Sequence, residues 1–190
     1  MARLALFALA VALPLAACSS TQPKASLESE DPDLVLWPDE EKAVRLQFKS
    51  DRDLNLYDSK PHSIQVCVYQ LDDKKAFLEQ SKTPEGIATL LKAEAFDKSV
   101  KSVTRLFIQP LEDAVFELDR AEDATFVGIV SGYFDSTPAN SAKLWQIKLK
   151  ETRSGHLFWA STIYSAGTLE LALRLTAKAM TGTVIPPKEQ

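Results

Sequence analysis

One short segment with a strict two-residue period constrains the fold of this chain more than any other feature. Apolar side chains alternate there with charged or amide ones, in the order Val44, Arg45, Leu46, Gln47, Phe48 and Lys49. A period of two puts an apolar face and a polar face on one extended strand. The apolar face must be covered, and two sheets packed face to face do this for many short strands.

Further runs along the chain are also predicted as strands, and they lie at 63–71, 103–109, 114–119, 125–134, 143–150, 156–164 and 169–175. The segment from Phe126 to Phe134 is apolar on both faces and contains Gly128 and Gly132, which favours a central strand covered on both sides. The last run alternates Leu with other residues, although these residues also form helices well. We interpret it as a strand, with a helix as the alternative.

One stretch instead has the features of a helix. Thr83 can cap the first turn, Pro84 suits the first helical position, and Glu85 lies near the positive end of the helix dipole. Ile87 and the Leu pair at 90–91 follow at helical spacing.

From these strand runs and the one helical stretch, the chain is predicted to be all-β, a two-layer sandwich of about eight strands with a short helical insert, over residues 43–180. Residues 181–190 are predicted to be a C-terminal tail.

The N-terminus is typical of a secreted lipoprotein. Arg3 precedes an apolar run that is shorter than the roughly 20 residues needed to span a bilayer, so residues 1–17 are predicted to be a signal peptide. Leu15-Ala16-Ala17-Cys18 resembles a bacterial lipobox, in which the thiol takes a diacylglyceryl group before cleavage. Cys18 is therefore the predicted lipidation site. The alternative is an ordinary signal-peptidase site that happens to contain a cysteine.

The residue after Cys18 helps to predict in which membrane the lipoprotein is anchored. Asp at this position retains many such lipoproteins in the inner membrane, whereas this chain has Ser19, which favours the outer membrane. Residues 18–42 are rich in Ser, Pro and acidic residues and are predicted to be a flexible tether. A coil of this kind has a root-mean-square reach of roughly 25 Å. The apolar residues 34–37 interrupt it and are candidates for docking on the domain.

Composition excludes several classes of partner. Without residues 1–17 the chain has 190 − 17 = 173 residues, and its net charge is 21 − 26 = −5 because only Arg3 is lost. A mildly acidic chain is a poor candidate for binding nucleic acid or anionic lipid by charge alone. With Cys18 acylated, Cys67 has no intrachain disulfide partner, and its apolar surroundings predict a buried thiol.

The sequence offers no recognisable catalytic or metal-binding motif. His62 and His156 are almost a hundred residues apart and both follow turn-forming residues, so they are predicted to be exposed loop residues. Paired acids occur at 72–73, 112–113 and 122–123, where strand runs end, which is typical of solvated turns. The chain is therefore predicted to be neither an enzyme nor a cofactor-binding protein.

Several short motifs occur in a fixed order between residues 43 and 175. They are Asp53-Leu54-Asn55, a strand ending in Tyr69-Gln70-Leu71, a Phe-containing helical insert at 76–92, Phe107-Ile108-Gln109-Pro110, and Phe126-Val127-Gly128-Ile129-Val130. With Trp145 and the lipobox, this order resembles the TssJ family, also called VasD or SciN, of type VI secretion outer-membrane lipoproteins. The chain departs from the family pattern at Leu111, where Gly usually follows the proline, and at Gln146, where Arg commonly follows the tryptophan.

The resemblance implies a transthyretin-like β-sandwich attached to the inner leaflet of the outer membrane. It also implies that the partner is the periplasmic C-terminal region of a TssM or IcmF-like inner-membrane subunit. In the family, the loop between the first two strands makes much of this contact. On this sequence the loop is 51–61, and the predicted partner-binding residues are Asp51, Asp53, Leu54, Asn55, Leu56, Tyr57 and Asp58.

The residues of this loop are compatible with recognition, because apolar side chains surrounded by acids are common in binding patches. Alternatively, Leu54 or Leu56 folds back onto the core. Two other functional hypotheses remain at this stage. The first is a lipoprotein that binds a small apolar or glycan ligand between the sheets, which requires a hollow core. The second is an envelope hydrolase, which requires converging acids or histidines.

Overall fold

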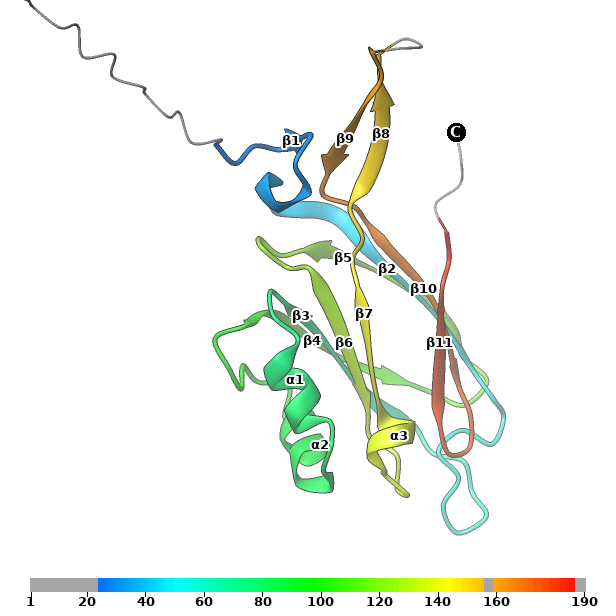
Figure 1. Cartoon of the computed structure of the whole chain (residues 1–190). Helices are drawn as coiled ribbons and strands as arrows, with labels where there is room; N and C mark the ends of the chain where they lie inside the picture. The colour runs from blue at the N-terminus through cyan, green and yellow to red at the C-terminus, as the bar shows by residue number, and fades with distance from the viewer. Residues whose placement is uncertain (1–23, 156–158, 187–190) are drawn as a thin grey trace, which may run out of the picture.

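Two four-stranded sheets pack face to face in a computed structural model of the chain, which describes residues 24–155 and 159–186 (Figure 1). One sheet has the order β11-β10-β2-β5 and the other the order β4-β3-β6-β7. Their strands are β2 Glu40–Ser50, β3 Ile64–Leu71, β4 Val100–Ile108, β5 Asp113–Arg120, β6 Phe126–Ser131, β7 Ala142–Gln146, β10 Leu169–Leu175 and β11 Met180–Val184. The predicted all-β, two-layer sandwich is confirmed.

The space between the sheets is filled by the residues that set the two-residue period. Val44, Leu46 and Phe48 of β2 are buried, while Lys49 is exposed. β10 pairs with β2 in parallel, and Leu171 lies opposite Leu46. All four leucines of β10 are buried, so the strand interpretation of 169–175 is confirmed. Each fully buried Leu contributes about 1.5–3 kcal/mol by leaving water, which makes any other register of these strands costly.

A second apolar cluster covers the outer face of the β4-β3-β6-β7 sheet. The helices α1 Lys75–Gln80 and α2 Pro84–Leu90 lie against this face (Figure 1), and Phe77, Ile87 and Leu90 pack on Tyr69. β6 lies between β3 and β7 and is almost entirely buried, which confirms the prediction of a central covered strand. Cys67 is a buried free thiol in the same cluster, as predicted, and burial raises its pKa.

The start of α2 follows the prediction from the sequence. The Thr83 hydroxyl accepts a hydrogen bond from the Gly86 amide at 3.1 Å, and Pro84 occupies the first turn. This cap satisfies one of the amides that have no partner within the first turn of a helix. The helices are short, so their position depends mainly on the apolar contacts with the sheet.

Gly128 is needed because α1 approaches β6 closely. A Cβ atom at this position would lie 2.6 Å from ring atoms of the buried Phe77 side chain. We expect Gly128→Ala to lower the free energy of unfolding by about 1–3 kcal/mol, because the ring must shift in a packed cluster. Urea denaturation measures the loss. Gly132→Ala is the matched control, since its Cβ would meet Leu91 at an ordinary 3.4 Å. Equal losses in the two variants would contradict this explanation.

A small third sheet projects from one end of the sandwich. Its order is β1-β9-β8, with β1 Glu28–Ser29, β8 Lys150–Ser154 and β9 Ser161–Ser165. The single strand predicted at 143–150 is therefore wrong. β7 ends at Gln146, the Ile147 amide donates to the Thr125 carbonyl, and β8 begins in the third sheet. The strand predicted at 156–164 is found only in part, as β9, because 156–158 lie outside the described residues.

The prediction of a flexible tether over 18–42 is wrong from Ser26 onward. The amide of Ser26 donates to the Leu34 carbonyl and the amide of Leu36 to the Ser26 carbonyl, and Val35 is buried. The short 3-10 helix η1 Pro32–Leu34 and β1 lie within this segment. Of the apolar residues 34–37, Val35 is buried and Leu34 and Trp37 are half-buried, so these three dock on the domain, whereas Leu36 is 45% exposed. Cys18 lies outside the described residues.

Arg120, at the end of β5, holds this segment in place. Its guanidinium is fully buried and donates to the carbonyls of Gly167 and Pro38. It also pairs with the Glu40 carboxylate at 2.9 Å and lies 5.1 Å from the centroid of a Trp37 ring. One side chain thus joins the N-terminal segment, β5 and the link between β9 and β10.

The predicted C-terminal tail is also partly wrong. β11 pairs with β10 from Met180 to Val184, and the Ile185 amide donates to the Glu170 carbonyl. Only Met180 is buried among the five residues of β11. The strand carries a weak apolar signal because its position depends on backbone pairing at a sheet edge rather than on buried side chains.

Candidate functional site

The loop between β2 and β3 lies at the end of the sandwich opposite to β1 and the β8–β9 hairpin (Figure 1). The short helix α3 Pro138–Ser141 and the turn between β10 and β11 lie at the same end. This arrangement joins three chain segments that are far apart in the sequence. The predicted loop position, between the strand at 44–48 and the strand at 63–71, is confirmed.

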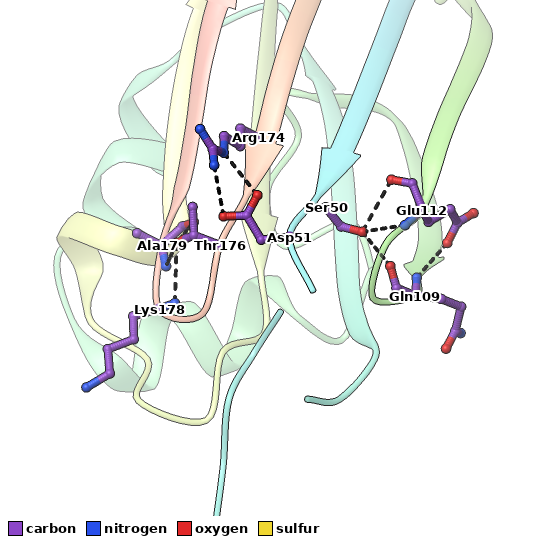
Figure 2. A network of polar contacts seen from close by, with 8 residues as sticks. All are labelled: Ser50, Asp51, Gln109, Glu112, Arg174, Thr176, Lys178 and Ala179. Carbon is purple, nitrogen blue, oxygen red and sulfur yellow. Dashed lines mark hydrogen bonds and ion pairs between the residues drawn. The ribbon is translucent and has the colours of Figure 1, made fainter. Parts of the chain in front are cut away.

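Polar contacts hold the base of the β2–β3 loop (Figure 2). Both carboxylate oxygens of Asp51 accept hydrogen bonds from Arg174, at 3.1 and 3.2 Å. This contact raises the pKa of Arg174. On the other side, the Ser50 hydroxyl donates to the Gln109 carbonyl at 2.6 Å and accepts from the Glu112 amide at 2.7 Å. The loop therefore begins from a position fixed by β10 and by the β4–β5 turn.

Backbone hydrogen bonds continue this support along the loop. The amides of Asp51, Asn55 and Leu56 donate to the carbonyls of Leu175, Thr176 and Ala177, respectively. The β10–β11 turn is itself held by Thr176, whose hydroxyl accepts from the Ala179 amide at 3.2 Å (Figure 2). Loops held by so many main-chain bonds keep a defined shape, which lowers the entropy cost of binding.

Asn55 joins the β2–β3 loop to the segment after β6. Its side-chain carbonyl accepts from the Phe134 amide at 3.0 Å, and its side-chain amide donates to the Ser63 carbonyl at 3.2 Å. Asn55 is almost completely buried and has a positive φ of 47°, which asparagine tolerates better than most residues. It supports the site from beneath.

A tight turn presents Tyr57 at the tip of the loop. Tyr57 and Lys60 exchange backbone hydrogen bonds of 3.0 and 2.9 Å, and the two residues between them, Asp58 and Ser59, both have positive φ. Positive φ at both central residues is typical of the two-residue turns that suit β-hairpins. Left-handed backbone costs roughly 1 kcal/mol for a non-glycine residue, so the surrounding contacts must maintain this shape.

Three rings from two segments form an aromatic cluster at this end, and we call Tyr57, His62 and Phe134 the tip cluster. The rings of Tyr57 and Phe134 are stacked with centroids 4.5 Å apart. The His62 ring stands edge-on to Phe134 at 5.1 Å. Tyr57 remains 56% exposed and Phe134 53% exposed, although each contacts the other. Stacked rings with free faces, held on a rigid base, are typical of a protein-binding hot spot.

Comparison with known proteins identifies the family. The family model of type VI secretion lipoproteins, described by the names VasD, EvfM and TssJ, matches residues 42–178. The chain belongs to this family. A search of curated proteins found no significant match.

Solved structures with the same fold include other type VI secretion lipoproteins. TssJ1 from Pseudomonas aeruginosa has a TM-score of 0.59 and 15% identity, over 80% of this chain and 98% of that chain. Lip from Serratia marcescens, a membrane-bound component of its type VI secretion system, has a TM-score of 0.54 and 16% identity, over 74% and 96% of the two chains.

A third similar structure is described as the TssM C-terminal domain from EAEC. It has a TM-score of 0.53 and 14% identity, over 76% of this chain and 98% of that chain. At these identities the likeness shows the fold alone.

In this type VI secretion lipoprotein, only some of the predicted partner-binding residues are exposed to a partner. Asp53, Tyr57 and Asp58 are exposed, and Leu56 is half-buried. Leu54 is fully buried in the main core, so its prediction as a contact residue is wrong: the alternative of folding back onto the core holds. The side chains of Asp51 and Asn55 are bound to neighbouring segments and form the base of the site.

Sequence reasoning missed Phe134 and His62 as members of the site. His62 was predicted to be an exposed loop residue, yet it is half-buried against Phe134. Phe134 was included in a buried strand, but β6 ends at Ser131. The available signal was its position directly before the turn-forming residues at 135–138.

No group of three or more His, Cys, Asp or Glu residues suited to a metal ion occurs in the described part of the chain.

The strongest pKa shifts belong to packed core residues. Burial raises the pKa of Tyr69 to about 12, and its hydroxyl donates to the Leu90 carbonyl. Burial also raises the pKa of Tyr133.

Within 24–155 and 159–186, none of the helices is long and apolar enough to cross a membrane. His156 lies outside the described residues.

Proposed function

We propose that this chain is a non-catalytic anchor of the type VI secretion membrane complex, attached to the inner leaflet of the outer membrane by lipid on Cys18. Its tip cluster binds the periplasmic domain of the inner-membrane TssM or IcmF-like subunit. The observation that carries this proposal is the stacked, exposed Tyr57–Phe134 pair on a rigid base. It requires no cofactor and no small-molecule substrate.

The position of the tip cluster supports a bridging role. The described chain starts beside β1, and the tip cluster lies at the opposite end of the sandwich (Figure 1). A protein anchored through its N-terminus therefore presents this end away from the lipid. The same loop exposes charges of both signs, Arg52, Asp53, Asp58 and Lys60, so the partner surface is expected to have an apolar pocket with a rim of mixed charge.

The choice of partner is supported by the family, which consists of type VI secretion lipoproteins. The alternative of a small apolar or glycan ligand requires a hollow core. Instead, the facing sides of the two sheets are filled by buried Leu, Val, Ile and Phe side chains.

A binding titration tests the proposal. We expect Tyr57→Ala and Phe134→Ala each to weaken binding to the purified periplasmic domain of the TssM-like subunit by 10- to 100-fold, as hot-spot truncations of about 1.4–3 kcal/mol do. Isothermal titration calorimetry of the mature chain measures the dissociation constants. Both side chains are more than half exposed, so the free energy of unfolding is expected to change little.

Phe107→Ala is the matched control for these variants. Phe107 is an aromatic side chain of β4 with 60% exposure, and it is not part of the tip cluster. Its removal should leave the dissociation constant unchanged. If Phe107→Ala weakened binding as much as Tyr57→Ala, or if neither tip variant changed affinity, the tip cluster would not be the binding surface.

A further inference from the structure

The β8–β9 hairpin ends in the most exposed large apolar side chain among the described residues. Trp159 is 88% exposed, compared with 65% for Leu111, the next most exposed. The hairpin projects beyond the sandwich (Figure 1), and all five residues of β8 are exposed. A side chain of this size in water, at the tip of a projection, has no structural use within the described fold.

The backbone of Trp159 lies close to Gly155 on the other side of the hairpin. Gly155 has a φ of 101°, and a Cβ atom there would lie 2.4 Å from the Trp159 carbonyl oxygen. Only glycine therefore allows the two sides of the tip to approach so closely. Between the tip and the sandwich, β8 and β9 pair without interruption, from the Ser154–Ser161 pair to the Lys150–Ser165 pair. The hairpin is a defined arm.

The N-terminal segment is attached at the base of this arm. Glu28 of β1 pairs with Ser165, and Ser29 pairs with Tyr164. The start of the described chain, β1 and the hairpin all lie at one end of the molecule (Figure 1). Any anchor at the N-terminus therefore brings its membrane to the hairpin end, away from the tip cluster.

The length of chain before Lys24 limits the distance to the membrane. Only residues 19–23 separate Lys24 from Cys18, so six residue steps extend at most about 22 Å. If all of residues 19–41 were a free tether, the same distance could reach roughly 75 Å. From Lys150 to Ser154 the hairpin rises about 13 Å, at ~3.3 Å per residue. The length of the arm is therefore more than half of the largest distance that can separate Lys24 from Cys18.

The chemistry of the arm suits a lipid surface. Tryptophan prefers the membrane interface because its ring is apolar and its N–H needs a polar partner. Residues 150–165 contain Lys150 and Arg153 against one acid, Glu151, so their net charge is 2 − 1 = +1 in a chain with a net charge of −4. The basic side chains can contact headgroup phosphates while Trp159 enters the interfacial layer.

We propose that the β8–β9 hairpin contacts the lipid surface in which Cys18 is anchored, with Trp159 in the interfacial layer. This inference rests on the lipid anchor of the proposed function. A second contact point beside the anchor restricts the tilt of the sandwich on the membrane. It therefore keeps the tip cluster directed into the periplasm, which an anchor with free rotation does not do.

Quenching by brominated lipid tests the contact. The full mature chain, purified with its lipid, is reconstituted into vesicles of phosphatidylethanolamine and phosphatidylglycerol, with and without brominated acyl chains. We expect bromine to quench the tryptophan emission of the unaltered protein and most of this quenching to be lost in Trp159→Phe. The remaining tryptophans, Trp37 and Trp145, are half-buried in the sandwich.

The matched control moves the exposed tryptophan to the other end of the molecule. A Trp159→Phe/Tyr57→Trp double variant keeps three tryptophans but should show no more quenching than Trp159→Phe alone. If the unaltered protein and Trp159→Phe are quenched equally, the contact is absent and the arm faces water or another protein. If the protein does not float with the vesicles, the anchor itself fails, and this inference fails with it.

Discussion

Cys18→Ser is expected to abolish type VI secretion while the free energy of unfolding of the domain stays unchanged. In the proposed function, the acyl chains on Cys18 contribute ~0.8 kcal/mol per buried CH₂ to membrane binding, and the acidic domain has little charge-based affinity to replace them. Without lipid the domain diffuses through the periplasm, and its effective concentration at the partner falls. Secretion of a substrate protein into the medium, together with cell fractionation, measures the effect.

Ser20→Ala is the matched control for this variant, because it changes a small polar residue two positions further along and keeps the lipobox. It should secrete normally. Urea denaturation of the Cys18→Ser chain separates loss of the anchor from loss of folding. Normal secretion by a Cys18→Ser protein that is present in soluble form would show that the anchor is not required.

Arg120→Met is expected to lower the free energy of unfolding by about 3 kcal/mol. Methionine keeps much of the volume but leaves the Gly167 and Pro38 carbonyls without their donor and Glu40 without its partner. A buried group that loses its hydrogen-bond partner costs about 1–3 kcal/mol, whereas the Glu40 side chain is 43% exposed and is hydrated once Arg120 is removed. For a domain of this size the melting temperature should fall by about 6–12 °C.

Arg45→Met provides the comparison for Arg120→Met. Arg45 pairs with Glu117 and Glu170, but its side chain is 40% exposed. Exposed ion pairs contribute about 0–1 kcal/mol, so its loss should be small. Hydrogen exchange adds a local readout, because Arg120→Met should raise exchange at the Ser26 and Leu36 amides, which donate within the N-terminal segment. Equal stability losses in both variants would contradict the role assigned to Arg120.

Much of the sandwich was predictable because its strands carry their own signal. The alternation at 44–49 and the leucines at 169–175 each specify which face is buried, and both strands are found as predicted. β11 and β1 could not be predicted in this way. Their positions depend on backbone pairing with β10 and β9, and few of their side chains are buried. Backbone groups are the same in every residue, so this pairing leaves little trace in the sequence.

The candidate site was predictable only in outline. The resemblance to the family indicated the β2–β3 loop, and Tyr57 is exposed there. It could not separate Tyr57 from Leu54, because both are apolar residues of one loop and differ only in which way the backbone turns. Phe134 reaches the site through a hydrogen bond with Asn55, a contact across 79 positions of sequence. Such a pairing appears only when the sheets are assembled.

By itself, the sequence of this type VI secretion lipoprotein determined the all-β class, a central covered strand beginning at Phe126 and a capped helix beginning at Pro84. It also supplied the cysteine motif on which the proposed anchor rests. These features depend on local periodicity or on adjacent residues. The tertiary structure alone decided that Arg120 holds the N-terminal segment on the domain and that the tip cluster and the hairpin lie at opposite ends. Packing decided these points because they depend on buried contacts between distant segments, such as those of Arg120.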